Sequence, residues 1–390
     1  MKYNFDKIID RKNTNSLKYD FATECGLPAD VLPLWVADMD FQTPPEVADT
    51  LVKVSQHAIF GYSETKKDYF NAVRNWFFKR FNFDIKPQWL VKTPGVVFAV
   101  STAIRALTKE NDSVLIQTPV YYPFYCSIEI NERKIVKNPL VYSDGKYTID
   151  FQDFENKIIE NKVKLFILCS PHNPVGRVWT KDELTKIGDI CLKHNVIIVS
   201  DEIHCDFVYK GHKHIIFGSI NEKFLNNSII CTAPSKTFNL AGLQASNIFI
   251  ADKIIREKFK LEIEKTGYEQ LNTMGLAACR AAYENGAQWV DELNEYLSKN
   301  LDYIRNFVKT NFPKVKLVEP QGTYLVWLDF NNLVSAEEEL YDIIINKAKL
   351  WVSKGTVFGT EGKRFIRINI ACPLEIIKLA FEKLKVAIDK

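Results

Sequence analysis

Short apolar runs alternate with longer amphipathic stretches between about residue 90 and residue 250. The runs rich in Val and Ile are typical of buried strands: "SVLIQ" (113–117), "KLFILCS" (164–170), "VIIVSDE" (196–202), "SIICTA" (228–233) and "SNIFIA" (246–251). A helical stretch begins at Thr180, with Glu183 three residues on, which is the pattern of a capping box. Strands that alternate with helices predict an α/β fold with a mostly parallel, doubly wound sheet. Such sheets bind ligands at the carboxyl ends of their strands.

The pattern changes after residue 285. A long helical segment runs over 287–312, with Val290, Leu293, Leu297, Leu301, Ile304 and Val308 at its apolar positions. Strands follow in "GTYLVWLDF" and "RFIRINIAC", and the chain closes on the helical pattern "PLEIIKLAFEKLKVAID". We therefore expect a large domain over 46–285 and a smaller α+β domain over 286–390. An N-terminal segment, 1–45, is expected to pack with the small domain, and without a Pro/Gly/Ser-rich linker the lobes should pack closely.

Composition narrows the classes of partner. The 390 residues carry 51 basic and 48 acidic side chains, a net charge of +3, which gives no support for nucleic-acid or membrane binding. The polar N-terminal stretch has no apolar signal region, and the longest apolar runs are strand-sized, so a cytoplasmic protein is expected. The eight cysteines form no C-x-x-C pair. Buried thiols in a reducing compartment are expected, rather than disulfides or a metal site.

One glycine–helix junction is a candidate phosphate site. In "TPGVVFAVSTAIRAL" the backbone amides of Gly95, Val96 and Val97 would point outward from a helix N-terminus, where a phosphate binds without a charged side chain. A glycine before a helix is common, so the junction alone indicates no more than an ordinary helix start.

Three polar residues follow successive predicted strands. Asn173, in "CSPHNPVGRVW", is either a turn residue or an amide donor to a ligand. Asp201 ends a buried strand, where it either caps a helix or meets a positive charge. Lys236, in "APSKTFNLAGLQAS", is either a surface charge or an amine whose pKa an apolar turn lowers for Schiff-base chemistry.

The order of these residues favours the functional interpretation. About one βα repeat separates Asn173 from Asp201 and Asp201 from Lys236, which places all three at the same edge of the sheet. Pyridoxal phosphate requires this set: a Schiff-base lysine, an acid for its ring nitrogen and a phosphate site.

These motifs resemble a known family over essentially the whole chain. The chain is similar to the class I/II aminotransferase superfamily, fold-type I pyridoxal-phosphate enzymes. The motifs "LWVADMDF", "HNPVGRVW", "SDEIH", "APSKTFNLAGLQ" and "RINIACP" look most like its MalY/PatB-type cystathionine β-lyase (C–S lyase) subgroup. The pairing of "WVADMDF" with "PSKTFNLAGLQ" is specific to that subgroup, whereas "HNPVG" marks only the superfamily.

The resemblance implies roles around the cofactor ring. Lys236 would be the Schiff-base lysine and the proton shuttle, Asp201 would pair with the ring nitrogen, and Asn173 with the ring hydroxyl. Tyr121 matches the aromatic residue that stacks on the ring, with core packing as its alternative. His204 stands where many members carry a tyrosine near the ring hydroxyl.

The resemblance also implies roles around the substrate. Arg367 would grip the α-carboxylate of the substrate by a two-pronged contact, and a structural salt bridge is its alternative. Ala37, with the rest of segment 35–41, and Tyr324 would line the substrate side, although the aromatic residues of that segment could equally belong to the core. Tyr62 would reach across a homodimer to the partner's phosphate, so that the two subunits share their active sites.

Two positions depart from the superfamily pattern. Gln244 stands where many members carry a phosphate-binding arginine, and Ala233 where they often carry serine. The phosphate would then depend more on the helix amides, Ser235 and Tyr62. The C–S lyase subgroup tolerates this pattern.

Three functions remain open on the sequence. The resemblance favours β-elimination from L-cystathionine or a related cysteine S-conjugate, a small amino-acid substrate, to pyruvate, ammonia and a thiol. An aminotransferase would use the same first steps. A regulatory protein that kept the fold and lost catalysis is the third alternative, and the presence of Lys236, Asp201 and Arg367 argues against it.

Overall fold

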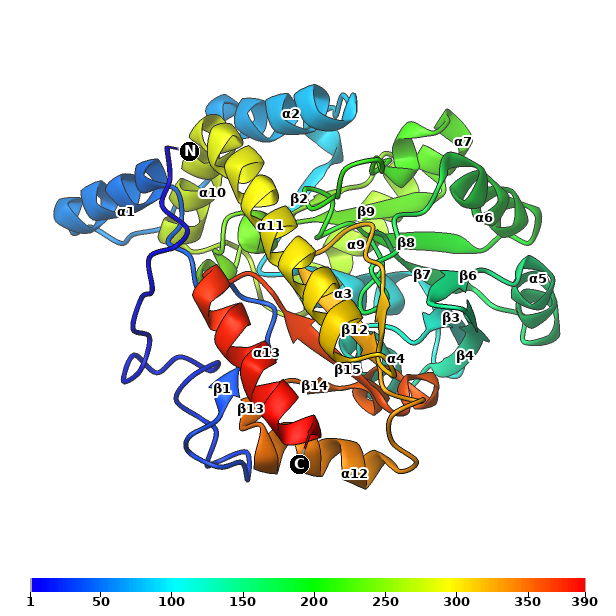
Figure 1. Cartoon of the computed structure of the whole chain (residues 1–390). Coiled ribbons are helices and arrows are strands. Elements are labelled where there is room, and N and C mark those ends of the chain that lie inside the picture. The colour runs from blue at the N-terminus through cyan, green and yellow to red at the C-terminus, as the bar shows by residue number, and fades with distance from the viewer. Residues whose placement is uncertain (1, 390) are drawn as a thin grey trace.

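A seven-stranded sheet forms the centre of the molecule in the computed structural model, which describes residues 2–389 (Figure 1). In spatial order its strands are β2 (Leu90–Thr93), β10 (Ser246–Phe249), β9 (Ser228–Thr232), β8 (Ile197–Asp201), β7 (Leu165–Cys169), β3 (Ser113–Thr118) and β4 (Lys134–Pro139). Adjacent strands from β9 to β4 pair in parallel, whereas β10 runs antiparallel to both of its neighbours. The predicted α/β class with a mostly parallel sheet is confirmed.

Apolar side chains of each strand pack on both faces of this sheet, because successive side chains point to opposite sides. In β7, Leu165 and Ile167 belong to one buried cluster, and Phe166 and Leu168 belong to another. The first face is covered by α3 (Val96–Leu107), α4 (Pro123–Ile130) and α9 (Lys253–Lys265). Elements of the second cluster include α2 (Lys67–Phe81), α5 (Phe151–Glu160), α6 (Lys181–Lys193), α7 (Glu222–Asn226) and α10 (Thr273–Asn285), and α1 (Pro45–His57) packs on α10. The sheet is therefore doubly wound, as predicted.

A second, antiparallel sheet follows in the chain. Its order is β11 (Lys316–Val318), β12 (Leu325–Asp329), β15 (Phe365–Asn369) and β14 (Ser353–Lys354). The helices of this part are α11 (Ala287–Asn311), α12 (Glu337–Tyr341) and α13 (Leu374–Ile388), and α11 packs on α13. All six predicted apolar positions of α11 are buried, which confirms the helical pattern.

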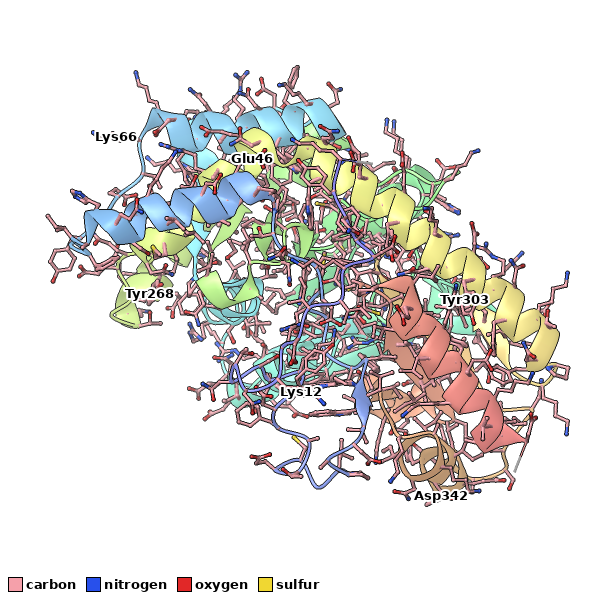
Figure 2. All side chains as sticks on the ribbon, turned by 60° about the vertical axis from the view of Figure 1, so that its left-hand side comes forward. Lys12, Glu46, Lys66, Tyr268, Tyr303 and Asp342 are labelled. Carbon is pink, nitrogen blue, oxygen red and sulfur yellow. The ribbon has the colours of Figure 1, made fainter. Side chains whose placement is uncertain are left out.

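The N-terminal segment meets the C-terminal part of the chain. Its strand β1 (Leu32–Pro33) pairs in parallel with β13 (Leu350–Trp351). In Figure 2 the extended trace that carries Lys12 crosses the face of the molecule between α1 and the C-terminal elements. A small hairpin of β5 (Val141–Ser143) and β6 (Lys146–Thr148) completes the strands.

Local signals in the sequence are found where they were expected. Thr180 and Glu183 form the predicted capping box at the start of α6, each side chain accepting from the other residue's backbone N–H. Six of the eight free cysteines are buried, whereas Cys25 and Cys126 are exposed. Within residues 2–389, no helix is long and apolar enough to cross a membrane.

Candidate active site

A cavity of about 200 Å³ opens at the carboxyl ends of β7, β8 and β9. It brings together ten of the predicted site residues: Ala37, Gly95, Val96, Val97, Tyr121, Asn173, Asp201, His204, Ser235 and Lys236. Three predicted residues do not line it. Two of these, Arg367 and Tyr324, contact residues that do, and the third, Tyr62, lies elsewhere.

Lys236 projects from α8 (Pro234–Thr237), the single helical turn that follows β9. Its Nζ donates to the backbone carbonyl of Ala37 at 2.6 Å. Burial lowers the pKa of Lys236 to about 8, with the charge of Arg367 acting in the same direction and those of Asp38 and Asp201 opposing it. The uncharged amine, the state in which it is a nucleophile and a base, is therefore far more populated near neutral pH than in an exposed lysine. The surface-charge interpretation is wrong.

Asp201 is the last residue of β8 and faces the cavity. Its Oδ1 accepts from the backbone N–H of Ile203 at 3.1 Å, in a turn and not at a helix start, so the helix-capping alternative is wrong. Burial raises the pKa of this carboxyl to about 7, whereas Lys236 acts to lower it. A cation in the cavity would stabilise the ionised form. The next residue, Glu202, points away from the cavity to His214, at 2.7 Å.

Arg367, on β15, is buried and reaches the edge of the cavity through Asn173. Its Nη1 donates to Asn173 Oδ1 at 3.0 Å, and its Nη2 donates to the carbonyl of Trp35 at 2.7 Å and to Ser353 Oγ at 3.1 Å. No carboxylate among residues 2–389 forms a salt bridge with it, and burial lowers its pKa to about 10. A buried guanidinium without a counter-ion favours an anionic ligand over the structural salt bridge. Because Asn173 Oδ1 accepts from Arg367, its Nδ2 amide is left to donate into the cavity.

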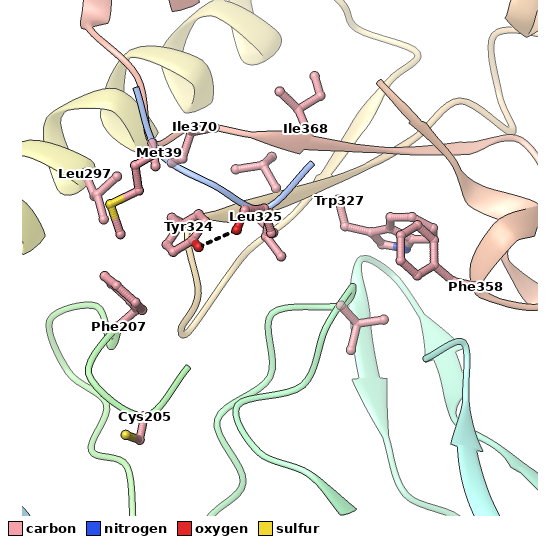
Figure 3. Packing of buried hydrophobic residues seen from close by; sticks show 14 of the residues in the cluster. Met39, Cys205, Phe207, Leu297, Tyr324, Leu325, Trp327, Phe358, Ile368 and Ile370 are labelled. Carbon is pink, nitrogen blue, oxygen red and sulfur yellow. Dashed lines mark hydrogen bonds between the residues drawn. The ribbon is translucent and has the colours of Figure 1, made fainter. Parts of the chain in front are cut away.

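Aromatic side chains lie in the wall of the cavity and directly behind it. His204 packs edge-on against Tyr324, with ring centroids 5.5 Å apart, and burial lowers its pKa well below the usual value. Tyr324 is fully buried, and its hydroxyl donates to the carbonyl of Ala37 at 3.0 Å, the dashed line in Figure 3. Tyr121 is half-buried and lines the cavity, so it does not belong entirely to the core.

The end of the cavity beside α3 has the geometry of a phosphate site without a cation. Gly95 is the N-cap residue of α3, and Val96 and Val97 begin the helix, so their amides have no partners within it. Ser235 and Gln244 also line the cavity, and the lining contains no arginine. Backbone amides and the helix dipole attract an anion without help from a charged side chain.

Tyr62 lies outside the cavity and is fully exposed. It sits in the 60–63 segment, which lines a groove of about 770 Å³ together with residues 267–274. Ile59 and Phe60 beside it are also exposed, by 68% and 63%. Within one chain, therefore, Tyr62 does not contribute to the site.

Sequence reasoning missed several residues of the site. Cys169, at the end of β7, and Ile203, in the turn after Asp201, both line the cavity. The polar residues of the site were predicted from their position at or after the end of a strand. The same criterion, applied to all residue types, would have identified Cys169 and Ile203. Asn369, at the end of β15, was also missed; it lies outside the cavity lining, and its Nδ2 donates to the carbonyls of Val36 and Asp38.

The residues of the cavity fit pyridoxal phosphate. A half-buried lysine, an unpaired carboxylate facing the cavity, an amide donor and a helix N-terminus are the donor set that its aldehyde, ring nitrogen, hydroxyl and phosphate require. The groups lie at one sheet edge because β7, β8 and β9 are neighbours in the sheet.

The fold and the site together place the chain in a known class of proteins. The family model of aminotransferase class I and II matches residues 29–384, and the chain belongs to this family. The chain is 43% identical to cystathionine beta-lyase PatB of Bacillus subtilis over 386 residues, 99% of this chain and 100% of that protein. The structure is similar to that of cystalysin from Treponema denticola, which contains pyridoxal 5'-phosphate (41% identity, TM-score 0.96, 100% of this chain and 99% of the other). It is also similar to the pyridoxal-phosphate-bound C–S lyase from Staphylococcus hominis (32% identity, TM-score 0.94, 100% and 99% covered).

Proposed function

We propose that the protein is a pyridoxal-phosphate-dependent C–S β-lyase that cleaves L-cystathionine or a related cysteine S-conjugate to pyruvate, ammonia and a thiol. The observation that carries the proposal is one cavity in which the Lys236 amine, its pKa lowered to about 8, lies among Ala37, Asn173 and Asp201. The likeness to a cystathionine β-lyase and to C–S lyases supports β-elimination.

Each residue has a task that its position allows. Bound pyridoxal phosphate supplies an electron sink for the carbanion that forms at the substrate Cα. The ionised Asp201 carboxylate would keep the ring nitrogen of the cofactor protonated, and the Asn173 amide would donate to its ring hydroxyl. Arg367 binds the substrate carboxylate, which fixes the Cα–H bond toward Lys236. Lys236 then takes the Cα proton and passes it to the departing β-sulfur, which leaves as a thiol. Water converts the remaining three-carbon enamine to pyruvate and ammonia.

Product analysis tests the function. We expect the purified protein to form pyruvate, ammonia and homocysteine from L-cystathionine with no keto acid added. If amino transfer occurs only when a keto acid is present, and no pyruvate is formed, the protein is an aminotransferase. Bound cofactor without turnover of any amino acid would instead support a regulatory role.

We propose that the protein acts as a homodimer whose subunits share their active sites. The fully exposed Tyr62, the exposed Ile59 and Phe60 beside it, and the lack of a cation at the phosphate end of the cavity support this assembly. The resemblance noted in the sequence supports Tyr62 as the side chain that one subunit donates to the other.

A hybrid dimer of two variants tests the shared site. Tyr62→Phe should weaken cofactor binding about tenfold, because one hydrogen bond to a phosphate is lost. A hybrid of Tyr62→Phe and Lys236→Ala subunits should carry one site with both native residues and recover cofactor affinity at that site. Equilibrium dialysis of the hybrid measures this recovery. If the hybrid binds no better than Tyr62→Phe alone, Tyr62 does not act across the dimer.

We also propose a cytoplasmic location and a three-part organisation of the chain. The six buried free thiols favour a reducing compartment. The pairing of β1 with β13 supports an N-terminal segment, 1–45, that packs with a small domain over 286–390 beside a large domain over 46–285.

A further inference from the structure

Four charged side chains form a cluster at the N-terminal segment: Arg11, Lys18, Asp38 and Asp40. Lys18 Nζ lies 2.8 Å from Asp40 Oδ2 and 3.6 Å from Asp38 Oδ1, and its side chain is completely buried. Arg11 bridges the same two carboxylates, at 2.7 Å from Asp38 Oδ2 and 2.8 Å from Asp40 Oδ1. Tyr19 adds a hydroxyl that donates to Asp40 Oδ2 at 3.0 Å. Two cations and two anions thus balance each other in a mostly buried site.

The two aspartates belong to the same segment, 35–41, that faces the active site. Its Ala37 carbonyl accepts from both Lys236 Nζ at 2.6 Å and Tyr324 Oη at 3.0 Å. Its Trp35 carbonyl accepts from Arg367 Nη2 at 2.7 Å. Both cationic side chains of the proposed site therefore rest on backbone carbonyls of one short segment.

This segment lacks secondary structure of its own, and beside the backbone bond from Asp40 N–H to the Ala371 carbonyl it is held mainly by side chains. Asn369 donates to the carbonyls of Val36 and Asp38, and Asn239 donates to those of Met39 and Phe41. These contacts bind the segment to the two parts of the chain that carry Arg367 and Lys236. The charge cluster fixes its opposite side, where the Asp38 and Asp40 side chains lie.

A buried ion-pair cluster is weak evidence for a role in stability. Desolvation of its charges offsets most of their attraction, and apolar residues of similar volume often serve a fold as well. Such a cluster can instead fix the positions of its side chains and of the backbone beside them. Here Asp38 is the residue next to Ala37, whose carbonyl accepts the hydrogen bond from Lys236.

We propose that Lys18 is a positioning residue for the proposed reaction: together with Arg11 it fixes Asp38 and Asp40, and so holds the Ala37 carbonyl against Lys236. The inference rests on the proposed function. Lys18 contacts neither Lys236 nor the cavity lining directly, and acts through the 35–41 segment.

The cluster also sets the charge near the amine. Arg367, Asp38 and Asp201 are the charged groups that act on Lys236, and Asp38 raises its pKa. Loss of Lys18 leaves two carboxylates facing Arg11 alone, so the site becomes more negative and favours a protonated nitrogen at Lys236. Loss of the Asp38 charge has the opposite effect. Unfolding of the whole site, in contrast, would expose Lys236 to water in both variants and shift both pKa values in the same direction.

Two variants of opposite charge provide the test. The visible absorption of the pyridoxal-phosphate-bound protein is titrated against pH, which reports the apparent pKa of the nitrogen that joins Lys236 to the cofactor. We expect Lys18→Met to raise this pKa by about half a unit and Asp38→Asn to lower it by about half a unit. We further expect Lys18→Met to reduce kcat about tenfold, with a smaller change in KM, because Lys236 is misplaced after substrate binds. Amide hydrogen exchange of a peptide that spans 35–41 should become faster in Lys18→Met.

Controls separate positioning from folding and from the proposed function. Lys253→Met, at a lysine whose side chain is 77% exposed, should leave the absorption titration unchanged, and Lys18→Arg should restore it. If Lys18→Met does not fold, the absorption titrations of Asp38→Asn and Lys18→Arg test the proposal in its place. Asp38→Asn should fold, because the Asp38 side chain is partly exposed. Shifts of equal sign in the two charge variants, or no shift in Asp38→Asn, overturn the proposal. Because the titration needs only bound cofactor, it remains informative if the wild-type protein cleaves no C–S bond.

Discussion

A Lys236→Ala variant is expected to lose nearly all turnover of L-cystathionine, with kcat lower by about 10⁴-fold. The change removes the amine that binds the cofactor and the base that takes the Cα proton, and no other lysine lines the cavity. Pyruvate release, followed in a coupled assay, measures the loss. Absorption above 400 nm should disappear with it, since that band reports a cofactor joined to a lysine.

The matched control for this variant is Lys253→Ala, on the exposed face of α9. It should retain both pyruvate release and the absorption band. If Lys236→Ala keeps more than about a hundredth of the wild-type rate, another group abstracts the proton, and the assignment of Lys236 as the base is wrong.

An Asp201→Asn variant is expected to lower kcat by about 10³-fold while KM changes little. Asparagine has nearly the same shape as aspartate but no negative charge, so it cannot keep a ring nitrogen protonated. Steady-state kinetics on cystathionine measure the effect, and bound cofactor is quantified by its absorption. The carboxylate acts only when charge develops, so the loss should fall on kcat and not on affinity.

The control for the charge change is Asp144→Asn, whose side chain is 91% exposed. It should be indistinguishable from the wild-type protein. A fall in cofactor content that accounts for the whole loss of activity in Asp201→Asn would assign Asp201 to cofactor retention and not to catalysis.

The sequence predicted the sheet and the polar residues at its edge because both depend on short-range patterns. Apolar runs of strand length located β3, β7, β8 and β9, and the polar residues at or after the ends of β7, β8 and β9 pointed to the cavity. Asn173, Asp201 and Lys236 therefore followed from chain order alone, since parallel neighbours end at the same edge.

Such short-range patterns could not predict contacts between distant parts of the chain. No local signal marks Lys18 as buried, because lysine is usually exposed and its partners lie about twenty residues away. The pairing of Arg367 with Asn173 depends on how the C-terminal sheet docks on the first sheet. The antiparallel direction of β10 could not be predicted either, because the apolar pattern of a buried strand is the same for both directions of pairing.

The pairing of Leu32 with Leu350 has a consequence for how the protein is made. During translation, the segment that holds Lys236 in place is made long before β13, the strand that anchors it. Contacts of such sequence separation form late and slowly in folding. A nascent chain can therefore assemble its first sheet before β13 is made, but it cannot complete the lysine site until then. Cofactor capture by this protein should accordingly report that synthesis has passed β13 and that β1 and β13 have paired.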